Sequence, residues 1–195
     1  MSVNNRHNPE PTWLRALGEA LEAHGDEPSA RFVQLATNGE CPSNRTVAFR
    51  GFHPSRSGLL FATDCRSEKV RQLRLNPEGA LCWYFHRTRE QFRLSGTVTV
   101  VDRETRDIDL ARKRVEVWGN LSRETKAQFF WPSPGEARTA RFVIPSGGVK
   151  PSASFCLLLL FPSRVDHLNI RNYPHNRIIH ELTPGGSWSQ REVNP

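Results

Sequence analysis

Apolar and polar residues alternate along much of the chain, which is the period of a β-strand with one buried face. Two such runs, at 45–52 and 59–63, are joined by a turn at 53–58. The same pattern predicts further strands at 30–37, 79–86, 89–102, 154–161, 165–170, 177–182 and 187–193. Because short turns link most of these strands, we predict a small antiparallel barrel, mainly β with flanking helices.

Four segments follow the helical period instead. They span about 12–24, 67–75, 103–121 and 122–130. Thr12 and Ser122 are the predicted N-caps of the first and the last, because a hydroxyl oxygen can accept a hydrogen bond from a free N–H of the first turn. In the second helix, Val70, Leu73 and Leu75 are predicted to face the core.

Composition is compatible with one barrel. A chain of 195 residues is long enough for one well-buried core and short for two, so we predict a single domain over 1–195 with a polar tail at about 1–10. Hydrophobic residues make up only 37%, but 5 Trp and 11 Phe each supply a large buried area. The segment 132–151, rich in Pro, Gly and Ser, is predicted to be a loop that is either mobile or covers a site.

The net charge of +7 leaves two kinds of partner open, because a basic surface attracts both nucleic acid and small phosphorylated ligands. The basic residues are scattered among predicted strands and helices, without a run of five or six and without an arginine-rich tail. This distribution favours a small phosphorylated ligand. A nucleic-acid-binding barrel stays as an alternative, and its affinity for oligonucleotides would fall steeply with salt.

The four cysteines, Cys41, Cys65, Cys82 and Cys156, lie far apart and form no C-x-x-C pair or Cys/His knuckle, so no metal site is predicted. No apolar run approaches the roughly 18 residues that indicate a membrane span. The polar first residues do not match a signal peptide. We therefore expect a protein of the reducing cytoplasm without membrane contact.

Cationic residues gather around the start of the helix that begins near Ser67. Arg45, Arg66 and Lys69 are expected to converge there with Ser67, where free N–H groups and the positive end of the helix dipole attract an anion. Lys69 lies in the first turn, where its ammonium is repelled by the dipole unless an anion is bound. The simpler interpretation of Lys69 is a surface lysine. We favour a phosphate at this point.

Arg45 and Arg50 lie on one strand at a spacing of five residues, about 16 Å at roughly 3.3 Å per residue. An odd spacing sends the two side chains to opposite faces, so they cannot grip the same phosphate. A ligand with a phosphate at one end and a flat polar ring at the other explains both, with Arg45 at the anionic end and Arg50 near the ring. Two solvated arginines on an edge strand explain this stretch equally well.

These residues resemble the flavin-binding half of the pyridoxamine 5′-phosphate oxidase family and its split-barrel relatives. The strand at 45–50 is similar to the family's Arg-x-Val-apolar-apolar-Lys/Arg motif, and 61–69 is similar to its Phe-x-Thr-(Asp/Asn)-x-x-Ser-x-Lys segment. The strand at 89–96 and the His-x-Arg pattern at 174–177 resemble two further family motifs. With gaps, the resemblance runs from about Pro11 to the end of the chain.

The resemblance implies an FMN-binding split β-barrel that forms a homodimer with FMN at the interface. The implied cofactor-binding residues are Arg45, Thr46, Val47, Arg50, Thr63, Arg66, Ser67, Lys69, Gln91, Ser122, Leu168 and Arg177. By the same resemblance, His175 lies by the substrate and Arg177 by the flavin, as the catalytic pair. We expect Arg45, Ser67, Lys69 and Arg177 to gather around one anion and the ring beside it.

Three of these residues also have a simpler interpretation. Gln91 shares a predicted strand face with Arg93 and Ser95, and it is either a solvated strand residue or an amide that both donates to and accepts from the flavin's pyrimidine edge. Ser122 is either a helix cap or a cofactor ligand from the second subunit. His175 is either a surface histidine or the substrate-side residue that the family pattern implies.

The implied reaction is hydride transfer from a substrate to flavin N5, with a B6 vitamer phosphate as the named candidate substrate. The chain departs from the family at Tyr173, where the family has an arginine, and at Leu168, where it has a tryptophan. The helix at 103–121 lacks the family's Tyr, Arg and Ser set for the substrate phosphate. The cofactor pocket is thus expected to be retained and the vitamin-phosphate pocket is not. The alternative function is a flavin- or tetrapyrrole-binding carrier or sensor without turnover.

Overall fold

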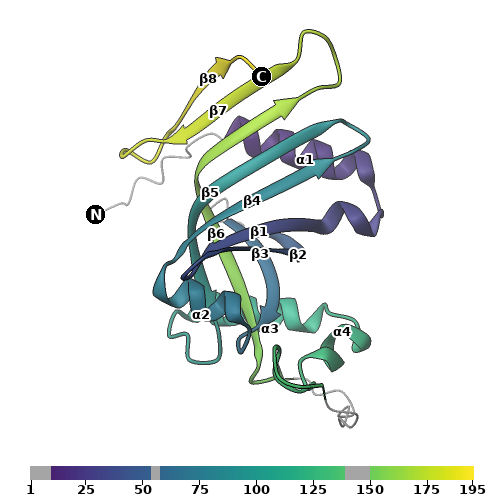
Figure 1. The fold of residues 1–195 in the computed structure, drawn as a ribbon, viewed down its shortest axis with the longest axis vertical. Coiled ribbons are helices and arrows are strands. Elements are labelled where there is room, and N and C mark those ends of the chain that lie inside the picture. The colour runs from purple at the N-terminus through teal and green to yellow at the C-terminus, as the bar shows by residue number, and fades with distance from the viewer. Residues whose placement is uncertain (1–9, 54–57, 139–149) are drawn as a thin grey trace, which may run out of the picture.

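The computed structural model describes residues 10–53, 58–138 and 150–195 (Figure 1). The strands in these ranges are β1 (Phe32–Asn38), β2 (Pro42–His53), β3 (Gly58–Asp64), β4 (Glu78–Phe85), β5 (Glu90–Val101), β6 (Phe155–Asn169), β7 (Asn176–Leu182) and β8 (Trp188–Val193). The helices are α1 (Thr12–His24), α2 (Glu68–Leu75), α3 (Ile108–Gly119) and α4 (Arg123–Gln128), with a 3-10 turn η1 at Pro28–Arg31.

The strands form one antiparallel sheet in the order β3-β2-β1-β4-β5-β6-β7-β8. Because β3 also pairs with β6, the first six strands of this order close into a barrel. The β7–β8 hairpin continues the sheet beyond the barrel and stands at one end of the molecule, while α2, α3 and α4 lie towards the other end (Figure 1). The predicted antiparallel barrel with flanking helices is confirmed.

Strand β6 joins the two parts of the sheet. The pattern predicted two strands here, at 154–161 and 165–170, but the structure has one strand of 15 residues. Its first half pairs with β3 and its second half with β7, and its pairing with β5 shifts register between Ser95 and Gly96. A Cβ atom at Gly96 would lie 2.1 Å from the carbonyl oxygen of Phe161, so only glycine fits this crossing.

Alternate residues of β6 serve two hydrophobic clusters, because successive side chains of a strand point to opposite faces. Cys156, Leu158 and Leu160 point into the barrel, where α1 covers the core. Phe155, Leu157 and Leu159 point outwards against the second cluster, which includes residues of α3 and, beyond it, Leu121 and Phe129. The uninterrupted apolar run at 155–161 therefore reads as a strand that is buried on both faces.

Several predicted element boundaries are wrong. Thr12 does not cap α1, because Pro11 holds the N-cap position and the Thr12 hydroxyl donates to Gln190 Oε1 at 2.7 Å. The first strand starts at Phe32, after the 3-10 turn. Leu75 is the last residue of α2 and is 78% exposed, so it does not face the core as Val70 and Leu73 do.

The two helices after β5 are shorter than predicted. Helix α3 begins at Ile108, because Asp107 caps it by accepting hydrogen bonds from the N–H groups of Asp109 and Leu110. The predicted cap of α4 is confirmed, since Ser122 Oγ accepts from the N–H of Thr125 at 3.2 Å. Residues 139–149 of the predicted loop lie outside the described residues. The longest described helix has 13 residues, too few to cross a bilayer.

Candidate functional site

A cluster of polar side chains lies where β3 passes into α2. Lys69 Nζ is 3.2 Å from Thr63 Oγ1 and 3.1 Å from Ser67 Oγ, and both hydroxyls accept from the ammonium. The Ser67 hydroxyl in turn donates to the carbonyl oxygen of Asp64 at 2.7 Å. The end of the strand and the start of the helix are thus tied together around the Lys69 ammonium.

Arg45 reaches the same region from β2. Its guanidinium donates to Thr37 Oγ1 at 2.6 Å and to Gln72 Oε1 at 3.2 Å, and Gln72 belongs to α2. Thr37 and Gln72 are both buried and are joined by a hydrogen bond of 2.6 Å between their side chains. Two buried neutral groups therefore hold the Arg45 guanidinium beside the helix that carries Lys69.

In the described part of the chain neither cation forms an ion pair, although the charge of Glu68 acts on both. Burial, and next the charge of Arg45, lower the pKa of Lys69 below its ordinary value, and burial lowers the pKa of Arg45 as well. Among the described residues, no carboxylate lies within 4 Å of either charged group, and Glu68 pairs with Arg71 instead. Two partly buried cations that repel each other favour an anion between them. We call Arg45, Thr63, Ser67 and Lys69 the anion pocket.

Arg66 does not join the anion pocket. Its guanidinium forms a two-point ion pair with Asp64, with distances of 3.0 Å from Nε to Oδ1 and 2.6 Å from Nη2 to Oδ2. It also donates to the carbonyl oxygen of Trp131 at 3.0 Å. The hydrogen bond with Asp64 raises the pKa of Arg66. The expected convergence is wrong for this residue, because a carboxylate two positions away satisfies it.

A second group of predicted residues lies on the sheet face that points away from the barrel interior. Gln91, Leu168 and Arg177 are successive cross-strand partners on β5, β6 and β7. On this face Arg93 and Ser95 also follow Gln91, as the alternation predicted, while Phe92 and Leu94 are buried in the core. We call Gln91, Leu168 and Arg177 the outer row.

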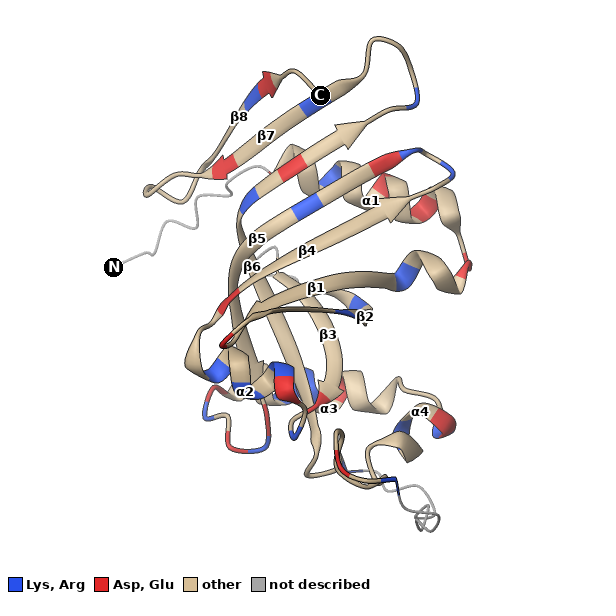
Figure 2. Cartoon of the chain, viewed as in Figure 1, with Lys and Arg blue, Asp and Glu red and all other residues tan. Residues whose placement is uncertain are grey.

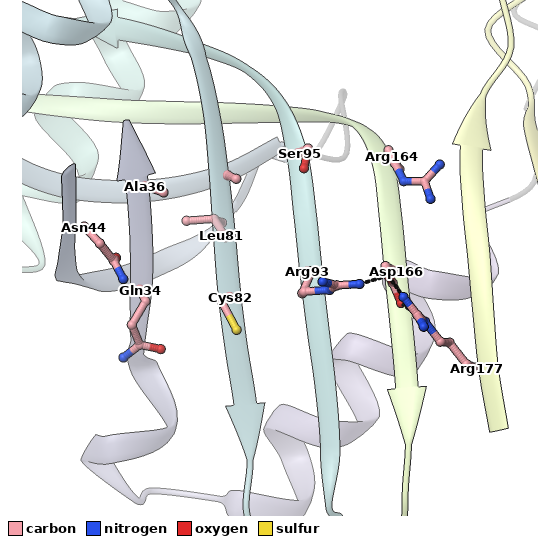
Figure 3. Close-up of a pocket in the computed structure, with 11 residues that line it drawn as sticks. Gln34, Ala36, Asn44, Leu81, Cys82, Arg93, Ser95, Arg164, Asp166 and Arg177 are labelled. Carbon is pink, nitrogen blue, oxygen red and sulfur yellow. Dashed lines mark hydrogen bonds and ion pairs between the residues drawn. The ribbon is translucent and has the colours of Figure 1, made fainter. Parts of the chain in front are cut away.

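Next to the outer row, one aspartate holds two arginines (Figure 3). Arg177 donates to Asp166 through Nε at 3.0 Å and through Nη2 at 2.8 Å, and Arg93 donates to the same carboxylate. Burial acts to raise the pKa of Asp166, but the hydrogen bonds from Arg177 and Arg93 outweigh it and the pKa is lowered. These groups line a cavity of about 380 Å³ that also includes Gln34 and Arg164.

The anion pocket and the outer row lie at opposite ends of β6. Thr63 pairs with Cys156, and Arg177 pairs with Leu168. These positions are twelve residues apart on β6, which is about 40 Å of strand at roughly 3.3 Å per residue. Within one chain the structure therefore gathers Arg45, Ser67 and Lys69 but not Arg177, and the expectation that all four meet is wrong for a single chain.

The chain is similar to proteins of known family over almost its whole length. Residues 10–102 match the family model described as pyridoxamine 5′-phosphate oxidase, FMN-binding domain. The pyridoxine/pyridoxamine 5′-phosphate oxidase 2 of Arabidopsis thaliana is 35% identical over 196 residues, which cover 94% of this chain and 96% of that protein. The chain belongs to the pyridoxamine 5′-phosphate oxidase-like family.

Solved structures of the family agree with the barrel. A pyridoxamine 5′-phosphate oxidase-related, FMN-binding protein from Nostoc punctiforme is 38% identical, with a TM-score of 0.90 and coverage of 96% of this chain and 100% of that chain. PhzG from Burkholderia lata, solved with tetrahydrophenazine-1-carboxylic acid, has a TM-score of 0.71 at 19% identity, with coverage of 100% and 98%, and shows the shared fold alone. The predicted FMN-binding split barrel and its cofactor agree with the family model and the Nostoc structure.

The remaining residues that the family motifs pointed to are spread over three places. The Val47 side chain is in the core, whereas Thr46 is exposed. Arg50 sits at a β-bulge between Phe49 and Gly51, on the face opposite Arg45 as predicted. Ser122 is exposed at the start of α4 and acts there as a cap.

His175 follows the β6–β7 turn and is exposed. Its Nδ1 lies 3.0 Å from the carbonyl oxygen of Asn172, and its ring is 6.0 Å from that of Tyr173, which is 92% exposed. An open groove of about 800 Å³ runs past this turn and Arg177 to the C-terminal residues 192–195. The His-x-Arg motif of the family thus lines a surface groove.

The helix where the family holds its substrate phosphate offers no free cationic cluster. Arg114 is buried and donates to the carbonyl oxygens of Phe155 and Ser152. Arg112 pairs with Asp109, and Lys113 pairs with Glu116 at 2.7 Å. Charged residues of both signs are scattered over strands and helices, as predicted (Figure 2). Of these three basic residues, only Arg112 is a solvated side chain on the helix face.

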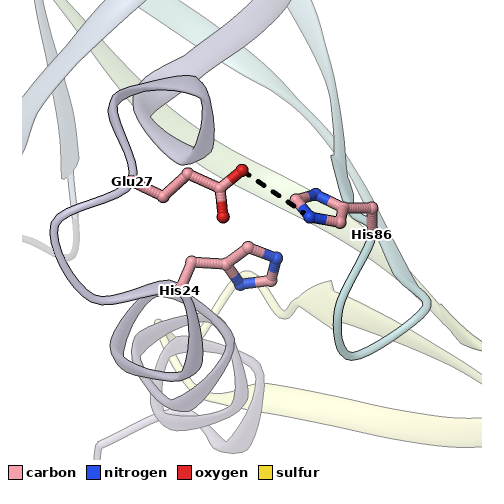
Figure 4. Close-up of side chains that lie close together, drawn as sticks. All are labelled: His24, Glu27 and His86. Atoms are coloured by element: carbon pink, nitrogen blue, oxygen red, sulfur yellow. Dashed lines mark ion pairs between the residues drawn. The ribbon is translucent and has the colours of Figure 1, made fainter.

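His24, Glu27 and His86 form a further cluster, which no sequence motif indicated (Figure 4). Both ring nitrogens of His24 are engaged, Nδ1 with the carbonyl oxygen of Ala20 at 2.8 Å and Nε2 with the N–H of Arg87 at 3.2 Å. Glu27 Oε2 lies 3.2 Å from Arg87 Nε. Through these contacts the cluster joins α1 to the β4–β5 turn.

Asp166, Thr37 and Gln72 were also missed by sequence reasoning. Asp166 follows Arg164 and precedes Leu168 on one face of β6, and this alternation is a local signal that a carboxylate stands in the outer surface. Nothing in the sequence pairs Thr37 or Gln72 with Arg45, because these contacts join segments 8 and 27 residues away. Long-range partners of this kind need the folded structure.

Proposed function

We propose that the chain binds FMN and acts as an FMN-dependent oxidoreductase related to pyridoxine/pyridoxamine 5′-phosphate oxidase. The observation that carries the proposal is the anion pocket. Lys69 and Arg45 are partly buried, close enough to lower the pKa of Lys69, and without a carboxylate partner among the described residues. A phosphate dianion at the start of α2 would satisfy both cations and the first N–H groups of the helix.

Each residue of the anion pocket would have its own role in binding the phosphate. Lys69 donates from the first turn of α2, and Arg45 donates from β2 with a guanidinium already fixed by Gln72. The hydroxyls of Ser67 and Thr63 both accept from the Lys69 ammonium, which fixes its position. A donor set that is arranged before the ligand arrives loses little side-chain entropy on binding.

We propose that the ring of FMN lies between two copies of the chain. Support comes from the positions of the anion pocket and the outer row at opposite ends of β6, about 40 Å apart along the strand. In a homodimer, the outer row of one subunit would meet the anion pocket of the other. Gln91 would then face the pyrimidine edge, Leu168 the ring, and Arg177 the edge where negative charge develops.

Bound FMN supplies a hydride acceptor at N5, and the chain supplies the surroundings. Arg177 is held by Asp166 and would stabilise negative charge on the pyrimidine edge. His175 stands on the same hairpin, two residues away, in the groove of about 800 Å³. From there its imidazole would orient the substrate and accept a proton at Nε2, since Nδ1 donates its own hydrogen to the Asn172 carbonyl.

The proposed substrate is pyridoxine or pyridoxamine 5′-phosphate, by relation to the Arabidopsis protein. Tyr173 is the observation that favours a second candidate function. It is fully open to solvent where the family pattern has a cation, and Arg114 on α3 is tied to main-chain carbonyls. A flavin-binding carrier or sensor would keep the cofactor pocket and would need no pocket for a substrate phosphate.

The visible spectrum tests the proposal. Purified protein mixed with FMN and passed through gel filtration is expected to elute yellow, as a dimer with about two FMN. Anaerobic addition of pyridoxine 5′-phosphate should bleach the flavin, and air should restore it. Colourless protein would refute FMN binding. A stable yellow protein that no B6 vitamer phosphate bleaches would favour the carrier or sensor.

A mixing experiment tests the shared site. Lys69→Ala and Arg177→Ala are each expected to bind FMN poorly. If each site takes Lys69 from one subunit and Arg177 from the other, a heterodimer of the two variants carries one intact site. Co-expressed and tandem-purified heterodimer should then hold about one FMN per dimer. Binding no better than in either variant alone would place the whole site within one chain.

FMN binding is expected to weaken at alkaline pH, because Lys69 loses its proton there. Its pKa lies below the ordinary 10.5 in the free protein, and a bound phosphate favours the charged ammonium. FMN affinity should therefore fall as the pH rises through this lowered pKa, starting below pH 10.5. Lys69→Arg, which stays protonated, should keep its affinity over the same range. Titration by flavin fluorescence measures both, and equal losses in the two proteins would contradict the assignment.

We also propose that the protein works in the cytoplasm. The four cysteines Cys41, Cys65, Cys82 and Cys156 are all free thiols. Burial raises the pKa of the Cys156 thiol. Free thiols are typical of a reducing compartment.

A further inference from the structure

The barrel fold alone does not explain why Asp166 stands buried on the outer face of the sheet. It is a carboxylate on the middle strand of three, its side chain is only 7% exposed, and it faces two guanidinium groups. Arg93 comes from β5 and Arg177 from β7, the two neighbours of β6 (Figure 3). A buried carboxylate of this kind stays charged only because both arginines bind it.

The geometry of the Arg177 pair is directional. The Cα partner of Asp166 on β7 is Ile179, so Arg177 leans diagonally along the sheet to reach the carboxylate. Two parallel hydrogen bonds, from Nε and Nη2, then fix the plane of the guanidinium. Nη1 and the second hydrogen of Nη2 are left free for another acceptor, and the side chain is still 27% exposed.

Without the carboxylate, nothing among the described side chains would hold Arg177 in this place. Within the described part of the chain, both side-chain hydrogen bonds of Arg177 go to Asp166. Arg93 would stand nearby as an unshielded like charge and would repel it. An arginine side chain with many rotamers would then extend into solvent.

We infer that Asp166 is a positioning residue that presents the Arg177 guanidinium to the ring end of the bound cofactor. This inference rests on the proposed function, in which Arg177 faces the edge of the ring where negative charge develops. Asp166 itself need not touch the cofactor. Its effect on the flavin passes through the place of Arg177, so removing either residue should affect the ring end and leave the phosphate end unchanged.

Comparison of FMN with riboflavin separates the two ends, because riboflavin lacks the phosphate. Asp166→Asn keeps the volume of the side chain but offers one acceptor oxygen in place of two and no charge. Asp166→Asn is expected to lower the affinity for both flavins by a similar factor of about 10, the loss typical of one hydrogen bond to a charged group. Arg177→Ala should do the same, and the double variant should bind no more weakly than Arg177→Ala alone.

The sign of the redox shift tells positioning from direct electrostatics. Removing an anion near the ring would by itself favour the reduced, anionic flavin and raise the midpoint potential. Loss of a correctly placed Arg177 guanidinium would lower the midpoint potential. We expect Asp166→Asn and Arg177→Ala to lower the potential of bound FMN together, measured by dye-coupled reductive titration.

Glu181→Ala is the matched control. Glu181 forms an ion pair with Arg164 on the same two strands, but its side chain is 46% exposed. Its removal should change neither the flavin affinities nor the potential, since exposed pairs contribute little. Thermal unfolding of each variant identifies any that does not fold. Asp166→Glu, which retains the charge, then serves as the second variant, and its midpoint potential should return towards that of the wild-type protein.

The outcomes are distinct. Wild-type protein that binds neither flavin would refute the proposed function, and this inference with it. Wild-type protein that binds FMN, combined with an Asp166→Asn variant of unchanged affinity, would overturn the role of Asp166 alone. So would a loss restricted to FMN, or a potential that rises in Asp166→Asn.

Discussion

Replacing Lys69 by alanine is expected to weaken FMN binding by about 30- to 100-fold, the range of a lost charge-assisted hydrogen bond in a partly buried site. The ammonium is fixed by Thr63 and Ser67 and pairs with no carboxylate among the residues that the structure describes, so its remaining donor is available to a phosphate. Riboflavin affinity should hardly change. Fluorescence titration with both flavins measures the two effects in one experiment.

Arg71→Ala is the control for this prediction. Arg71 lies two residues further along α2 and carries the same charge, but its side chain is 71% exposed and it pairs with Glu68. Its loss should change FMN affinity by no more than about twofold, because long-range attraction between exposed charges is screened by salt. Equal losses in Lys69→Ala and Arg71→Ala would show that general positive charge, and not the anion pocket, attracts FMN.

Replacing Trp83 by alanine is expected to lower the free energy of unfolding by about 3–5 kcal/mol, the usual cost of removing a buried tryptophan. Trp83 is fully buried, stacks on Phe85 at 5.2 Å and contacts Phe49 edge-on at 4.9 Å. Its Nε1 donates to the carbonyl oxygen of Ala30 at 2.9 Å, which ties β4 to η1. Since domains are stable by only about 5–15 kcal/mol, the variant should be marginal.

Urea denaturation followed by circular dichroism measures the change. Trp83→Phe should cost less, because it keeps most of the ring packing and loses the bond to Ala30. Leu75→Ala is the surface control, since Leu75 is 78% exposed and its truncation should leave stability within about 0.5 kcal/mol. A cost below about 1 kcal/mol for Trp83→Ala would contradict the assignment of Trp83 to the centre of the core.

The strands and the faces of their side chains could be read from local pattern. Gln91, Arg93 and Ser95 share the outer face of β5, and Arg45 and Arg50 lie on opposite faces of β2, as the alternation predicted. A strand's period of two residues fixes these relations without reference to any other segment. The helix boundaries failed where a competing local contact decided them, as at Thr12 and Asp107.

Cation partners were harder to predict. Arg66 and Lys69 have similar charge and lie three residues apart, yet Arg66 is satisfied by Asp64 and Lys69 is not. The guanidinium of Arg114 on α3 already donates to the carbonyl oxygens of Phe155 and Ser152, about 40 residues away in sequence. Whether a basic residue is available to a ligand depends on these partners, which composition does not report.

The sequence by itself determined the mainly β class, the four helical segments and the family motifs, because each depends on neighbours within a few residues. Only the tertiary structure decided that β3 pairs with β6, that Asp166 holds Arg177, and that the anion pocket and the outer row lie at opposite ends of one strand. Those relations arise from register between strands distant along the chain, and register is fixed by the packing of the whole barrel.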